Sequence, residues 1–64
     1  MKQKKGNILQ SRRRAALLSQ QELADACGLS ITTIQKAEHN AGSVKHTTLR
    51  FICQYLGVAV EEVL

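Results

Sequence analysis

Residues 19–38 read SQQELADACGLSITTIQKAE, and this stretch contains the start and stop signals of two short helices. Ser19 and Glu22 have the S-x-x-E spacing of a capping box. In such a box the serine hydroxyl accepts a hydrogen bond from the backbone N–H of Glu22, and the glutamate carboxylate accepts one from the N–H of Ser19. The first helix of the pair is therefore expected to begin at Gln20.

The second helix follows the first after a very short turn. Gly28 can take the left-handed conformation that ends a helix without a Cβ penalty. Ser30 can cap a helix that runs from Ile31 to about Glu38. Two helices joined by a three-to-four-residue turn that contains glycine form a helix-turn-helix unit. In this unit Ala24 is expected to face the second helix at the point where the two helices cross, which requires a small side chain. Ile34 is expected to be the apolar anchor of the second helix.

The pattern resembles the helix-turn-helix of phage repressors and Cro, the XRE-like family. The family motif reads roughly Leu-Ser-Gln-x-x-Leu-Ala-x-x-x-Gly-Val-Ser-x-x-x-Ile-x-x-x-Glu, and the resemblance extends without a gap over about residues 8–64. It implies a small all-α fold and binding to double-stranded DNA. The matching positions are Leu18, Ser19, Gln20, Leu23, Ala24, Gly28, Ser30, Ile34 and Glu38 in the motif, Leu9 and Arg13 before it, and Leu49, Ile52, Leu56, Gly57 and Val58 after it.

Length and composition indicate one all-α domain, a compact bundle of about five short helices. The chain has 64 residues, no proline and four glycines, and a domain of this size buries only about 60% of the surface of its unfolded chain. We expect residues 1–6 to be a flexible basic arm and residues 7–64 to be the helix-turn-helix domain. Besides the motif, the expected helices are 8–16, 46–56 and 60–64.

Several local signals set these outer boundaries. Asn7 is expected to cap the first helix. Leu9 and Ala16 are expected to lie on the inward face of that helix. Where the family has glycine after the second motif helix, the chain has Asn40, the best other residue for a left-handed position. Ser43 is a possible cap for the fourth helix. That helix is expected to have one apolar face, made of Leu49, Ile52, Cys53 and Leu56, and to end at Gly57.

The basic residues gather at the start of the chain. The net charge is +4, and Lys2, Lys4, Lys5, Arg12, Arg13 and Arg14 all precede Glu22, the first acidic residue. This asymmetry fits a polyanion partner, and it fits a solubilising arm equally well.

Catalytic, metal and membrane functions are not indicated. Cys27 and Cys53 are too far apart for a CxxC motif and are expected to be apolar fillers. Neither cysteine has a metal-ligand spacing to His39 or His46, and no phosphate-binding glycine loop occurs. No apolar run reaches the ~20 residues of a membrane span. We expect a soluble, cytoplasmic, non-enzymatic protein without cofactor or metal.

The resemblance assigns DNA-contacting roles to particular residues. Base edges in the major groove would be read by Ile31, Thr32, Gln35 and Lys36, whose methyl, hydroxyl, amide and ammonium groups suit that task. Gln20 would clamp a phosphate at a helix N-terminus. The further phosphate candidates are Ser30, Thr33, Asn40 and Lys45, together with His39 and Ser43.

In the family, residues at the positions of Arg13 and Glu38 form a structural ion pair between the first and third helices. The alternative is that Arg13 belongs to a phosphate-binding patch with its two arginine neighbours. We favour the ion pair.

The sequence leads to two functional hypotheses. The first is a sequence-specific transcriptional regulator, a repressor that binds DNA as a homodimer through an apolar ridge of Val58, Val60, Val63 and Leu64. The second is a protein-interaction module with the same fold, for example the antitoxin partner of a toxin.

Overall fold

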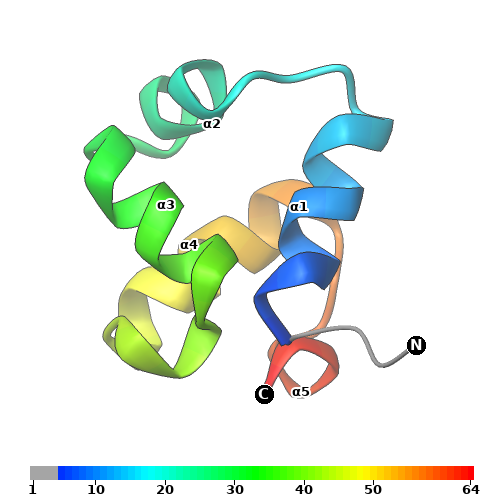
Figure 1. The fold of residues 1–64 in the computed structure, drawn as a ribbon, viewed down its shortest axis with the longest axis vertical. Helices are drawn as coiled ribbons and strands as arrows, with labels where there is room; N and C mark the ends of the chain where they lie inside the picture. Colours follow the sequence, from blue (N-terminus) through cyan, green and yellow to red (C-terminus); the bar gives the residue numbers. More distant parts are fainter. Residues whose placement is uncertain (1–4) are drawn as a thin grey trace.

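A computed structural model describes the backbone of residues 5–64 and the side chains from Ile8 onward. Within this range the chain is all-helical and has no strand (Figure 1). The helices are α1 (Lys5–Ala15), α2 (Gln20–Cys27), α3 (Ile31–His39), α4 (His46–Leu56) and α5 (Val60–Val63), with a short 3₁₀ helix at Ala41–Ser43 between α3 and α4. The expected all-α fold class is confirmed. None of the described helices is long and apolar enough to cross a membrane.

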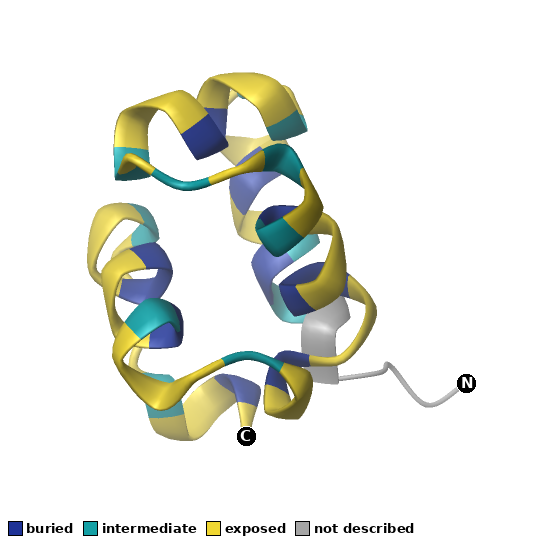
Figure 2. Ribbon diagram, turned by 90° about the vertical axis from the view of Figure 1, so that its left-hand side faces the viewer, coloured by how far each residue is buried: buried dark blue, intermediate teal, exposed yellow. Residues whose placement is uncertain are grey.

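One apolar core holds the helices together. Every α-helix contributes to it, and the buried residues lie on the inward sides of the ribbons (Figure 2). The core is aliphatic, because the only Phe and the only Tyr of the sequence are on the surface. Its largest fully buried side chains are Leu9, Leu23, Ile34, Leu49, Ile52, Cys53 and Val63.

The boundaries of the helix-turn-helix follow the predicted caps. The Ser19 hydroxyl accepts from the N–H of Glu22 at 3.0 Å, and the Glu22 carboxylate accepts from the N–H of Ser19 at 2.8 Å. Gly28 ends α2 with φ 69°, a left-handed conformation. Ser30 caps α3 by accepting from the N–H of Thr33 at 3.2 Å. Short-range hydrogen bonds and the conformation of Gly28 therefore set the ends of α2 and the start of α3.

The bounds predicted for the first helix were wrong at both ends. The helix begins at Lys5, so Asn7 lies inside it and is not its cap; residues 1–4 of the predicted basic arm lie outside the described residues. It ends at Ala15, and Ala16 is exposed in the following turn instead of facing inward. Leu17 supplies the left-handed residue that ends α1, with φ 61°. The N–H of Leu18 then donates to the carbonyl of Arg13 at 3.1 Å, as in a Schellman C-cap.

Leu17 is expected to limit stability. It is 89% exposed, so its side chain contributes little packing, and a left-handed conformation costs an L-residue about 1–2 kcal/mol. Leu17→Gly should raise the free energy of unfolding by about 0.5–1 kcal/mol in urea denaturation, after allowance for the greater freedom of glycine in the unfolded chain. Leu17→Ala keeps the Cβ atom and is the control. Equal stability of the two variants would show that the backbone of Leu17 is not strained.

The turn after α3 differs from the prediction. Asn40 is extended, with φ −156°, and does not take a left-handed conformation. Its side-chain oxygen accepts from the N–H of Gly42 at 3.1 Å, which starts the 3₁₀ helix. Ser43 does not cap α4, because its hydroxyl donates to the carbonyl of Asn40 at 2.7 Å. The residue before α4 is Lys45, which makes no side-chain cap, whereas the predicted bounds of α4 and the stop at Gly57 (φ 75°) are confirmed.

The short α5 folds back onto α1 and α4. Val63 is fully buried, and Val58 is only 7% exposed. These two residues of the predicted dimer ridge are therefore core residues, because the segment that holds them packs against α1 and α4. Of the four predicted residues, Val60 is half-buried and Leu64 is 43% exposed, so only these two remain accessible.

Candidate nucleic-acid interface

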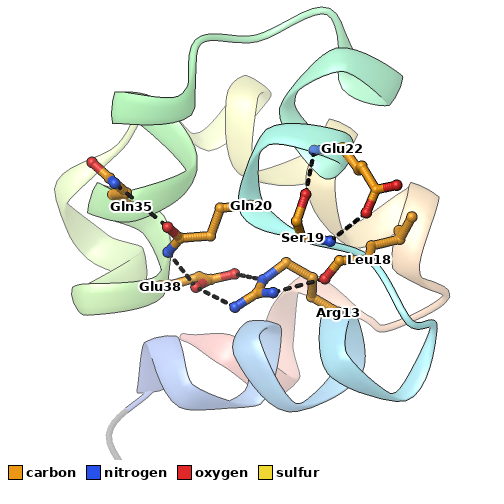
Figure 3. Close-up of polar contacts among 7 residues, drawn as sticks. All are labelled: Arg13, Leu18, Ser19, Gln20, Glu22, Gln35 and Glu38. Carbon is orange, nitrogen blue, oxygen red and sulfur yellow. Dashed lines mark hydrogen bonds and ion pairs between the residues drawn. The ribbon is translucent and has the colours of Figure 1, made fainter.

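A buried ion pair joins α1 to α3. Arg13 Nε donates to Glu38 Oε2 at 2.5 Å and Arg13 Nη2 donates to Glu38 Oε1 at 3.3 Å, and the two residues are only 7% and 5% exposed (Figure 3). Arg13 Nη1 also donates to the carbonyl of Leu18 at 2.7 Å. Arg13 is thus part of the scaffold and not of a phosphate patch. Its neighbours Arg12 and Arg14 are exposed.

Gln20 connects this ion pair to the surface of α3. Its amide nitrogen donates to Glu38 Oε1 at 3.0 Å, and its amide oxygen accepts from the amide nitrogen of Gln35 at 3.4 Å (Figure 3). The sequence predicted only a phosphate clamp at this position. The contact with Glu38 was missed, because the motif aligns the two residues without revealing that their side chains meet.

The predicted base-reading residues share the outer part of α3 but differ in exposure. Thr32, Gln35 and Lys36 are exposed, whereas Ile31 is half-buried and packs against the core. Ile31 therefore has only part of its side chain available to a ligand. Together, the exposed groups offer a methyl, a hydroxyl, an amide and a cation, a mixture that suits the donors, acceptors and methyl groups of the major groove.

The residues predicted to contact phosphates differ in how far their polar groups are already engaged. The Ser30 and Thr33 hydroxyls hydrogen-bond to each other at 2.9 Å, and the Asn40 amide is engaged in its own turn. Lys45 is exposed and has no ion pair among the described residues. It directly precedes α4, whose first backbone N–H groups lack a side-chain cap and can donate hydrogen bonds to an anion.

The two cysteines lie against or within the core. Cys53 is buried and Cys27 is half-buried. Burial raises the pKa of both thiols, and the nearby Glu62 carboxylate raises that of Cys53 further. Both thiols are therefore poor nucleophiles at neutral pH. The described part of the chain has no group of three side chains able to hold a metal ion.

The family comparison agrees with this geometry. The helix-turn-helix family profile matches residues 9–63, which covers all of the elements described above except the first turn of α1. No curated protein and no solved structure shows a significant match to the chain. The match spans well over half of the 64 residues. The chain therefore belongs to the helix-turn-helix DNA-binding family of the phage-repressor and Cro type.

Proposed function

We propose that this protein is a sequence-specific transcriptional regulator that inserts α3 into the major groove of double-stranded DNA and represses by occupying a promoter or operator. The observation that carries the proposal is the exposed set Thr32, Gln35 and Lys36 on a helix held in place by a buried ion pair. A rigid support of this kind keeps base-reading side chains in a defined position. Such a regulator would act in the cytoplasm, where its DNA lies.

Phosphate contacts on both sides of α3 would position the helix in the groove. The start of α4 has no side-chain cap, and Lys45 adds a cation beside it. At the start of α2, only the N–H groups of Gln20 and Gln21 lie outside the capping box of Ser19 and Glu22. Arg12 and Arg14 are further exposed cations without an ion pair in the described chain. Contacts to phosphates set orientation but carry no sequence information.

Binding of labelled duplex DNA at increasing salt, measured by fluorescence anisotropy, tests this proposal. The affinity should fall by nearly one power of the salt concentration for each phosphate contacted. Lys36→Ala should relax the preference at one base position by ~1–3 kcal/mol. Lys45→Ala removes the same charge from a phosphate-contacting position and should weaken all sequences alike. A salt slope near zero would contradict DNA binding, and an unchanged base preference in Lys36→Ala would contradict the assignment of the reading face.

We also propose that the protein binds DNA as a homodimer, because one recognition helix reads only a few base pairs. Two-fold pairing sets recognition helices about one DNA turn apart, ~34–36 Å. The accessible residues of the predicted ridge lie on the α4–α5 face, in a hollow of about 530 Å³ lined by His46, Arg50, Val60, Glu61 and Leu64. Arg50 and Glu61 form no ion pair within the described chain. A two-fold axis could therefore pair each of them with the opposite charge on a second copy.

Leu64→Asp is expected to prevent this pairing. Leu64 is 43% exposed, so the variant should fold normally but place a charge in an apolar contact. In sedimentation velocity with two-site DNA, copies of the Leu64→Asp protein should not associate with each other. Binding of the variant to the two sites should therefore no longer be cooperative. Leu17→Asp makes the same change at an exposed leucine outside this face and should leave assembly unchanged. If Leu64→Asp binds as cooperatively as the wild type, the interface is elsewhere or the protein acts as a monomer.

The antitoxin-like alternative requires a surface specialised for another protein. The family match and the exposed polar and cationic side chains of α3 favour DNA instead.

A further inference from the structure

We propose that Gln35 reads adenine and that Glu38, which does not reach the DNA, determines this choice by orienting the amides of Gln20 and Gln35. This inference rests on the proposed DNA-binding function. It assigns a role in base specificity to a residue whose evident role is structural.

The first step is the orientation of the Gln20 amide. A carboxylate can only accept hydrogen bonds. Glu38 accepts from Arg13 with both oxygens, and its Oε1 atom also accepts from Gln20 Nε2 at 3.0 Å. The Gln20 side chain must therefore turn its nitrogen toward Glu38. Its oxygen then faces away from the ion pair and toward α3 (Figure 3).

The second step is that the oriented Gln20 amide in turn orients the amide of Gln35 on the surface of α3. Gln20 Oε1 can only accept, and it accepts from Gln35 Nε2 at 3.4 Å, the longest contact of the chain of hydrogen bonds. Gln35 is exposed and lies one helical turn before Glu38. One N–H of its amide is thereby occupied. One N–H and the carbonyl oxygen remain for a ligand.

The third step is the match to a base. In the major groove adenine presents an acceptor at N7 and a donor at its N6 amino group. The remaining N–H and carbonyl oxygen of Gln35 complement this pair. Guanine presents two acceptors, N7 and O6, so the Gln35 carbonyl would oppose O6. The orientation imposed through Gln20 therefore favours adenine over guanine.

The experiment compares duplexes that carry A or G at the position read by Gln35. The wild-type protein first selects a preferred duplex from a random pool, and the position at which Gln35→Ala loses preference is then varied. The key variant is Gln20→Leu, which removes both amide contacts without touching the ion pair. The control is Gln21→Leu, because Gln21 is an exposed neighbour that bonds to Asp25 at 2.9 Å on the same helix. Glu38→Gln is a second variant, since its amide can donate and no longer forces one orientation.

The A-to-G affinity ratio cancels any uniform loss of phosphate binding. We expect the wild type and Gln21→Leu to prefer adenine by about 5- to 150-fold, and Gln20→Leu to keep less than about threefold. Glu38→Gln should reduce the ratio in the same direction. The inference is overturned if Gln35→Ala selects the wild-type sequence, if the base read is not adenine, or if Gln20→Leu retains the full ratio. In these cases the wild type still selects a sequence, whereas a wild type that selects none contradicts the DNA-binding function itself.

Discussion

Replacement of Glu38 by alanine is expected to lower the free energy of unfolding by about 3–5 kcal/mol, the cost of breaking a buried ion pair by removing one partner. Arg13 would keep only its bond to the carbonyl of Leu18, in a site where the residue is 7% exposed. Gln20 would lose its acceptor as well. A domain of 64 residues has a total stability of about 3–10 kcal/mol. The variant should therefore be partly or largely unfolded at 25 °C.

Urea denaturation followed by circular dichroism measures this loss. Glu61→Ala is the matched control, because Glu61 is exposed and has no ion pair among the described residues, so its removal should change stability by less than about 1 kcal/mol. Equal midpoints for the two variants would show that the pair with Arg13 does not hold α1 against α3.

Val63→Asp is expected to unfold the protein rather than only separate a dimer. Val63 is the fully buried last residue of α5, which packs on α1 and α4, and an unpaired carboxylate there should cost about 4 kcal/mol or more. Thermal melting of Val63→Asp should show no cooperative transition, whereas Leu64→Asp, one residue further along, should melt like the wild type. A Val63→Asp variant that melts cooperatively near the wild-type temperature would contradict the packing of α5 and restore the predicted ridge as a dimer surface.

Those parts of the fold that depend on neighbouring residues could be predicted from the sequence. The capping box of α2, the stop at Gly28 and the cap at Ser30 each involve residues within a few positions of one another. The bounds of α4 followed from its apolar face and from Gly57. These signals act locally, so tertiary structure did not override them.

The wrong predictions concern residues whose conformation depends on distant contacts or on competing turns. Leu17 ends α1 although a leucine carries no signal for a left-handed position. Asn40 uses its side chain to start a 3₁₀ turn, an alternative that the family pattern does not distinguish from a left-handed stop. Val63 was predicted to belong to an apolar dimer ridge, but α5 folds back onto α1 and buries it.

The sequence predicted which residues belong to the candidate site, but it did not predict the hydrogen bonds that link them. The pairing of Arg13 with Glu38 followed from the family resemblance, and the exposed residues of α3 followed from helix position. The link from Glu38 through Gln20 to Gln35 spans 18 positions for its first contact and 15 for its second, so only the three-dimensional structure reveals it.

Selection of random duplex DNA on the purified wild-type protein tests sequence-specific binding most directly. We expect enrichment of a palindromic sequence with half-site centres ~10 base pairs apart, bound about 10³-fold or more tightly than a scrambled duplex of the same composition. A pool that stays random after repeated rounds, with equal affinity for the selected and scrambled duplexes, would contradict it.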